Sequence, residues 1–105
     1  MSYTVRVAER AEHDLDAIIA YLLDEFRSPQ AAKRVLEDYE NLLDSLESMP
    51  TSHAFVNDPV PASLGYRWST VGNYVAYFTI DQDAQVVFIE RILYQSQNWQ
   101  SILLS

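Results

Sequence analysis

The nine residues Val-Val-Phe-Ile-Glu-Arg-Ile-Leu-Tyr at positions 86–94 decide the fold of this 105-residue chain. They are rich in β-branched and aromatic types, which favours a strand, and apolar side chains occupy both sets of alternating positions. We therefore expect this strand at the centre of a sheet. Glu90 and Arg91 interrupt the pattern. Because neighbouring strand side chains point to opposite faces, one of these charges must meet the helix side of the sheet or its rim, and we expect it to be paired or functional.

Two strands upstream complete a meander. Residues 66–69 alternate between aromatic and polar types, residues 71–73 (Val-Gly-Asn) provide a turn, and the run 74–80 is largely apolar. Residues 81–84 (Asp-Gln-Asp-Ala) form the next turn. This pattern predicts three consecutive antiparallel strands.

The first half of the chain predicts a strand and two helices. Alternation over residues 3–7 indicates a short strand, and from Glu9 the apolar residues recur every three or four positions, as in an amphipathic helix. Ser28 followed by Pro29 is an N-cap with proline at the first helical position, so a second helix begins there, and Pro50 marks its end. The two apolar stripes comprise Ala11, Leu15, Ile18, Leu22 and Phe26, and Ala32, Val35, Leu36, Tyr39, Leu42, Leu43 and Leu46. Because the connection is short, the helices should form an antiparallel hairpin with both stripes facing one core.

The remaining segments complete an α+β domain. Residues 51–63 contain two prolines and no periodicity, which predicts an ordered surface loop, and the spacing of apolar residues within 96–104 predicts a short closing helix. The expected fold is an N-terminal strand, an antiparallel helical hairpin, a three-stranded antiparallel meander and a short C-terminal helix. The N-terminal strand should pair within or beside the meander. We expect one domain spanning residues 1–105, with both helices on one face of the sheet.

Composition excludes several classes of protein. Fifteen Asp and Glu against seven Lys and Arg give a net charge of −8, which opposes direct, tight binding of nucleic acid and favours basic protein partners. The chain has no cysteine and only two glycines, so a disulfide framework, a thiolate nucleophile and a Gly-rich phosphate loop are excluded. No stretch is apolar enough for a signal peptide or a membrane span, so we expect a cytoplasmic protein with no metal and no cofactor.

Few residues of this chain are candidates for catalysis, metal binding or base stacking. His13 is expected on the polar side of the first helix, whereas His53 lies in the loop after the second helix, where it is either a mobile acid or base over a cleft or a plain loop histidine. Helical spacing spreads four acidic residues around the first helix, so we expect them to face solvent rather than to bind a metal: Asp14, Asp16, Asp24 and Glu25. The strand aromatics Tyr66, Trp68, Tyr74, Tyr77 and Tyr94 are either core residues or a base-stacking platform, and the scarcity of cations on those strands favours the core.

A set of apolar residues lies at the stripe edges or in the tail. They are Tyr21, Leu23, Trp99, Ile102 and Leu103. We expect some of them to be exposed and rimmed by acidic side chains, which suits an amphipathic partner helix that carries Lys or Arg. Trp99 is the expected aromatic anchor of that interface.

The order of these segments carries a resemblance that spans nearly the whole chain. It rests on the opening strand 3–7, the helix segment 11–18 followed by Tyr21, the close of the second helix at 42–50, the segments 65–67 (Gly-Tyr-Arg), 71–78 (Val-Gly-Asn-Tyr-Val-Ala-Tyr-Phe), 80–81 and 86–94, and Trp99. In this order the segments resemble the RelE/ParE superfamily of toxins from bacterial type II toxin–antitoxin systems. The resemblance implies a small toxin that is neutralised by a cognate antitoxin, whose C-terminal segment wraps the toxin as a helix or an added strand. A homodimer or a heterotetramer with the antitoxin is compatible with it.

The same resemblance bears on the target. RelE-like members cleave mRNA on the ribosome with basic residues, whereas ParE-like members lack that set and poison DNA gyrase. Tyr74 stands where RelE-like enzymes place an arginine, and Tyr94, Gln95 and Ser96 stand where they carry histidine or basic residues. These positions favour a ParE-like, non-enzymatic gyrase inhibitor.

Two alternatives remain open. The first is a RelE-like, metal-independent endoribonuclease, for which the candidate catalytic residues are Arg67, Tyr94, Arg91 and His53. Of these, Arg67 matches the arginine found early in the family's meander, and Tyr94 keeps a proton donor. The second alternative is an attenuated member that only binds the antitoxin and acts as a transcriptional corepressor.

Overall fold

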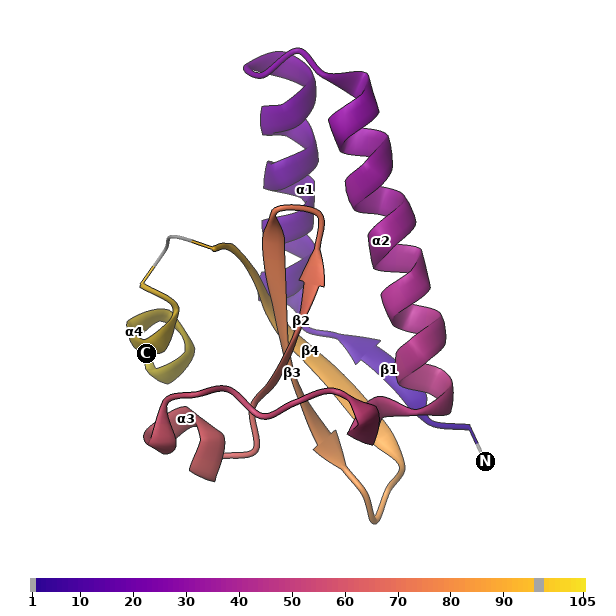
Figure 1. The fold of residues 1–105 in the computed structure, drawn as a ribbon, viewed down its shortest axis with the longest axis vertical. Coiled ribbons are helices and arrows are strands. Elements are labelled where there is room, and N and C mark those ends of the chain that lie inside the picture. The colour runs from indigo at the N-terminus through magenta and orange to yellow at the C-terminus, as the bar shows by residue number, and fades with distance from the viewer. Residues whose placement is uncertain (1, 96–97) are drawn as a thin grey trace.

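A four-stranded sheet positions every other element. The computed structural model describes residues 2–95 and 98–105, and its sheet has the strand order β1-β4-β3-β2 (Figure 1). β4 (Val86–Tyr94) lies between β1 (Thr4–Val7), which is parallel to it, and β3 (Tyr74–Asp81), which is antiparallel. β2 (Arg67–Val71) pairs with β3 at the other edge. The predicted meander and the central position of β4 are confirmed, and the N-terminal strand lies beside the meander.

Two long helices pack on one face of this sheet. α1 (Glu9–Asp24) and α2 (Pro29–Ser48) form the predicted hairpin, and Figure 1 shows its tip beyond the β2–β3 turn. The Ser28 hydroxyl accepts a hydrogen bond of 3.1 Å from the Ala31 N–H, so the predicted N-cap is confirmed. No helix of the described residues is both long and apolar enough to cross a membrane.

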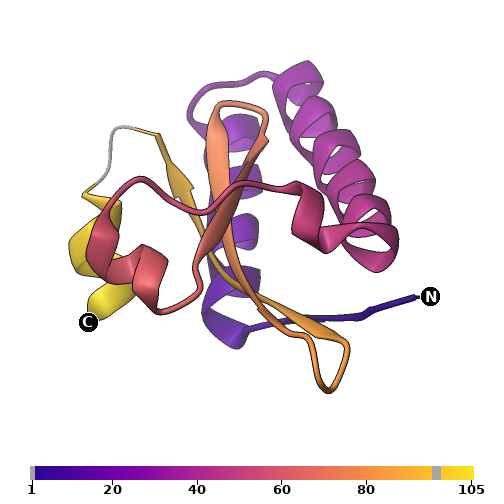
Figure 2. The ribbon, with the colours of Figure 1, turned by 60° about the horizontal axis from the view of Figure 1, so that its bottom comes forward.

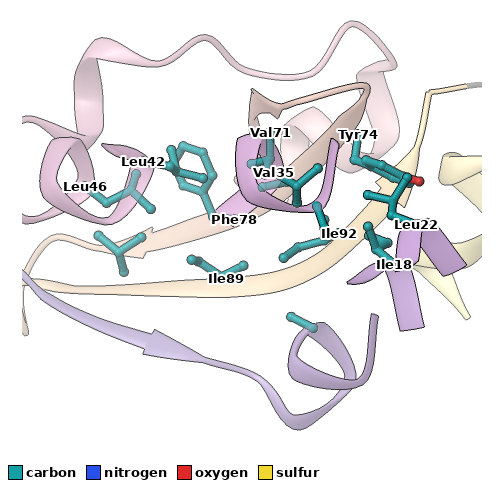
Figure 3. Close-up of a cluster of buried hydrophobic side chains, with 14 residues drawn as sticks. Ile18, Leu22, Val35, Leu42, Leu46, Val71, Tyr74, Phe78, Ile89 and Ile92 are labelled. Atoms are coloured by element: carbon teal, nitrogen blue, oxygen red, sulfur yellow. The ribbon is translucent and has the colours of Figure 1, made fainter. Parts of the chain in front are cut away.

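The main core lies between the hairpin and the sheet. Figure 3 shows Ile18, Leu22 and Tyr74 at one end of this core, and Leu42, Leu46 and Phe78 at the other. Two stripe residues were predicted wrongly. Phe26 is 61% exposed because α1 ends at Asp24 and the chain turns at Arg27, which has a positive φ of 53°. Leu36 is exposed because it stands one position beyond the buried Val35, on the solvent side of α2.

The segment that was predicted as a loop contains two short helices. A 3₁₀ turn spans Pro50–Ser52, and α3 spans Pro59–Ser63. Asp58 caps α3 by accepting the Val60 N–H at 3.1 Å, and proline at the first helical position completes the signal that the sequence reasoning missed.

The second face of the sheet has a core of its own. α4 (Trp99–Leu104) lies beside α3, away from α2 (Figures 1 and 2). Its Leu103 joins Val56, Tyr77 and Leu93 in a second buried cluster. The predicted closing helix is confirmed, although residues 96 and 97 of the predicted segment lie outside the described residues.

Candidate functional site

A β-bulge determines where the two charges of β4 lie. Ile89 and Arg91 stand opposite neighbouring residues of β3, so Glu90 is the extra residue. The alternation of side chains therefore shifts by one position. Val87 and Ile89 belong to the helix-facing core before the bulge, and Ile92 belongs to it after the bulge.

Arg91 is paired with Asp14 of α1. Its Nε and Nη2 donate to the two carboxylate oxygens at 2.7 and 2.8 Å, and the Ile92 N–H donates to Asp14 at 3.0 Å. The prediction that Asp14 faces solvent is wrong: β1 ends at Val7, opposite Ile89, and beyond that point the Asp14 carboxylate meets the edge of β4. The hydrogen bond to Asp14, and its charge, raise the pKa of Arg91, against the opposing effect of burial. The expected pairing of one β4 charge is confirmed.

Glu90 lies in a small cavity on the α4 side of the sheet. The cavity measures about 90 Å³ and is also lined by Arg10, Tyr66, Ile102 and Leu103. Burial raises the pKa of Glu90, and the nearby Arg10 charge partly offsets this effect.

Arg67 fastens the segment after α2 to the sheet. Its Nη1 donates to the His53 carbonyl at 2.6 Å and to the Thr51 carbonyl at 3.3 Å, and its guanidinium lies 3.9 Å from the centre of the Phe55 ring. His53 shares a hydrogen bond of 2.9 Å with the Ser45 hydroxyl of α2. Burial lowers the pKa of His53, and the Arg67 charge lowers it further. These contacts tie His53 to both α2 and β2.

The four candidate ribonuclease residues do not meet in one place. Tyr94 pairs with Tyr74 at one end of β3, whereas Arg67 pairs with Phe78, so four residues or about 13 Å of strand separate the two positions. Arg91 forms a salt bridge with Asp14 of α1. Among residues 2–95 and 98–105, no group of three carboxylate or histidine side chains is arranged to hold a metal ion.

The strand aromatics also do not form one platform. Tyr74 packs in the helix-facing core, whereas Tyr77 packs in the second core on the opposite face. The expectation that favoured the core is confirmed for these two residues, while Trp68 and Tyr94 are exposed.

The tail residues that were expected to meet a partner pack against the chain itself. Trp99 stacks on Tyr77 with ring centres 5.3 Å apart and planes 15° apart. Leu103 is only 8% exposed, and Ile102 is half-buried beside it. Leu103 is therefore not among the exposed members of this set, because α4 closes over the second face of the sheet.

A groove that sequence reasoning missed lies at the tip of the helical hairpin. It has a volume of about 990 Å³ and is bounded by the ends of α1 and α2, the β2–β3 turn and the end of β4. Tyr21, Phe26, Tyr74 and Tyr94 line it. Tyr21 and Leu23 are exposed as expected, but Leu23 does not line the groove. The register that sets Tyr74 beside Tyr94, not a local motif, brings these rings together.

The aromatic walls of the groove are held by contacts among the rings. Tyr21 stacks on Phe26 at 6.4 Å, and Tyr74 meets Tyr94 edge-on at 5.5 Å. Burial raises the pKa of the Tyr74 hydroxyl, and the neighbouring Tyr21 and Tyr94 hydroxyls raise it further. Three phenol groups therefore converge on one site.

The β2–β3 turn is fixed against α2 at the floor of the groove. The Gly72 N–H donates to the Asp38 carboxylate at 2.8 Å. Gly72 has a φ of +60°, and a Cβ at this position would stand 2.9 Å from the Val35 Cγ2. Only glycine combines this backbone conformation with this close approach.

The family of the chain follows from a sequence match. The model of the ParE toxin of the type II toxin–antitoxin system parDE matches residues 5–99. The chain belongs to the ParE toxin family. In this ParE-family toxin, the segment that matches the family model begins in β1 and ends at the first residue of α4, so it includes the Asp14–Arg91 pair and the residues that line the groove. No curated protein sequence matches the chain significantly.

Solved structures share the fold of this ParE-family toxin. The chromosomal ParDE toxin–antitoxin system of P. aeruginosa has a chain that is 22% identical, with a TM-score of 0.67 over 89% of this chain and 96% of that one. The RelBE2 toxin–antitoxin complex of Mycobacterium tuberculosis is similar at 18% identity, with a TM-score of 0.53 over 90% and 100% of the chains. The archaeal RelE–RelB complex of Pyrococcus horikoshii OT3 is similar at 13% identity, with a TM-score of 0.61 over 92% and 99%.

Proposed function

We propose that this ParE-family toxin inhibits growth by binding DNA gyrase, without cleaving RNA, and that a cognate antitoxin silences it. The antitoxin partner is supported by the family, and the three similar structures come from toxin–antitoxin systems. The proposed absence of RNA cleavage is supported by the chemistry of the sheet.

The observation that supports this proposal is that both arginines of the three meander strands, Arg67 and Arg91, are held by contacts within the fold. The Arg67 guanidinium donates to two backbone carbonyls, and the Arg91 guanidinium is bound to Asp14. Cleavage of RNA without a metal builds negative charge on a phosphorane, and preorganised cations usually supply the largest share of its stabilisation. Tyr94 pairs with Tyr74 at one end of β3, whereas Arg67 pairs with Phe78, so the Tyr94 hydroxyl and the Arg67 guanidinium lie at separate positions along the sheet. This arrangement favours a binding toxin over a nuclease.

Expression of the chain in bacteria with and without the neighbouring reading frame tests the proposal. We expect the chain alone to slow growth and the neighbouring frame to restore it. Purified toxin should inhibit gyrase supercoiling and trap cleaved DNA, while mRNA on purified ribosomes stays intact. Unimpaired growth at verified soluble expression would instead support an attenuated, antitoxin-binding corepressor.

Tyr94→Phe separates binding from nuclease chemistry, because it removes the phenol proton and keeps the ring. We expect growth inhibition to survive this substitution. Codon-phased mRNA cuts that disappear in Tyr94→Phe would overturn the proposal and support the ribonuclease alternative. The melting temperature of the variant serves as the control for folding.

A further inference from the structure

The bulge in β4 places an acidic side chain at the joint between α4 and the sheet. Glu90 is the extra residue of the bulge, and it lines the small cavity of about 90 Å³ together with Ile102 and Leu103 of α4. Leu103 belongs to the second core and is buried there, so α4 covers the cavity with apolar side chains. A cavity of this volume has room for water.

Few polar groups surround the Glu90 carboxylate. Arg10 of α1 and Tyr66, which precedes β2, line the same cavity. Arg91 also lines it, but its guanidinium is bound to Asp14. Among the described residues Glu90 forms no ion pair, so Arg10 lies nearby without closing a salt bridge. The sequence of α4, Trp-Gln-Ser-Ile-Leu-Leu, contributes no ionisable side chain.

Ionisation of Glu90 works against the docking of α4. Burial raises the pKa of Glu90, and the Arg10 charge offsets only part of this effect. Burial also raises the pKa of Tyr66, and the Glu90 charge raises it further against the opposing Arg10 charge, so these groups share one electrostatic environment. When α4 closes, an ionised carboxylate loses water that the side chains of Ile102 and Leu103 cannot replace. A protonated carboxyl costs less to cover.

The two states of α4 therefore differ in the pKa of Glu90. With α4 released, the carboxyl faces water and has its ordinary pKa near 4.5, whereas with α4 docked the pKa is higher. Docking is most favourable below about pH 4.5, weakens as the pH rises, and levels off above the raised pKa of the docked state.

We propose that Glu90 is a proton-sensitive latch for α4: the protonated side chain lets α4 close over the sheet, and the ionised side chain draws water into the cavity and loosens α4. Loosening uncovers Leu93 and Tyr77 of the second core, of which Tyr77 stacks on Trp99 in the closed state. The latch thus controls the exposure of the apolar face opposite the helical hairpin. It is independent of the target proposed above.

Hydrogen exchange of the Leu103 amide, measured by NMR between pH 5 and pH 7.5, tests the latch. This amide exchanges when α4 opens, whereas the amide of Phe78, buried in the main core, reports global unfolding. We expect Glu90→Gln to raise the protection factor of Leu103 about fivefold at pH 7.5, because glutamine keeps the shape of the side chain without its charge. The ratio between variant and unaltered chain should fall as the pH drops to 5, where Glu90 begins to bind its proton.

The matched control is Glu40→Gln. It removes the same charge from an exposed position of α2 that does not line the cavity. We expect the protection factor of Leu103 to stay within about twofold of the unaltered chain.

Arg10→Ala tests the charge that faces Glu90. Without Arg10 the ionised carboxylate is less well compensated under α4, so the protection factor of Leu103 should fall about twofold at pH 7.5. The same substitution should have no effect in the Glu90→Gln background, as a double-mutant cycle requires. Arg34→Ala, at an exposed arginine of α2 outside the cavity, is the control.

The fluorescence of Trp99 in a Trp68→Phe background gives a second measurement with Glu90 in place. We expect the emission to move to shorter wavelength as the pH falls from 7.5 to 5, because α4 packs Trp99 on Tyr77. Adding Glu90→Gln should remove this shift.

Three results would overturn the latch. The first is equal protection of Leu103 in Glu90→Gln and the unaltered chain at pH 7.5. The second is a gain that is the same at pH 5 and pH 7.5, because glutamine would then only pack better than glutamate. The third is a parallel gain at Phe78, which would assign the effect to global stability instead of α4.

Discussion

Replacing Asp14 with alanine tests the contact that joins α1 to the central strand. The substitution removes two charge-assisted hydrogen bonds to Arg91 and leaves the Ile92 N–H without its acceptor. The side chains of Asp14 and Arg91 are only 15% and 18% exposed. Breaking a buried pair costs about 3–5 kcal/mol, and the residual exposure places this case near 3 kcal/mol.

That loss is large enough to measure by two methods. For 105 residues with an unfolding entropy of about 2.1 cal/mol/K per residue, about 3 kcal/mol corresponds to a fall of about 14 °C in Tm. Urea denaturation followed by tryptophan fluorescence gives the free energy of unfolding directly. Asp16→Ala on the exposed side of the same helix is the control and should change stability by less than about 0.5 kcal/mol.

A double-mutant cycle shows whether the pair itself is responsible. Arg91→Met should cost about 2 kcal/mol, because Asp14 keeps its bond to the Ile92 N–H. The double variant should cost about 3 kcal/mol instead of the sum, which gives a coupling energy of about 2 kcal/mol. A cost below about 1 kcal/mol for Asp14→Ala, or additive costs in the double variant, would refute this reasoning.

Three further substitutions probe the turn, the α2 segment and the tail. Gly72→Ala should lower the free energy of unfolding by roughly 2 kcal/mol in urea, since it strains a positive φ and drives a Cβ into Val35; an unchanged midpoint would contradict the close approach. Burial and a nearby positive charge lower the pKa of His53. As the pH falls, the unfolded chain therefore takes up a proton at His53 before the folded chain does, and the free energy of unfolding should fall as the pH drops through about 6.5. His53→Gln should flatten the profile of Tm against pH. An equally steep profile in this variant would show that His53 does not cause the pH dependence. Trp99→Ala should lower the free energy of unfolding by about 2 kcal/mol, measured by thermal unfolding, because the ring packs on Tyr77 of the sheet. An unaltered Tm would contradict this packing role and support the earlier expectation that Trp99 contacts a partner.

Local patterns in the sequence determined most of the secondary structure. Ser28 with Pro29 marks the start of α2 because the cap and the fixed φ act within one turn of helix. The central position of β4 could be predicted because apolar side chains on both alternating positions need cover on both faces. The family resemblance depends on the order of such segments, and the matched ParE toxin family agrees with it.

Only the tertiary structure decided where the charges and the aromatic rings meet. Asp14 and Arg91 are 77 positions apart, and their contact depends on where β1 ends and on a bulge that no local periodicity predicts. The groove likewise depends on the register that sets Tyr74 beside Tyr94, and on the packing of the β2–β3 turn against α2. Periodicity determines which face of an element is buried, whereas register and bulges determine which distant side chains become neighbours.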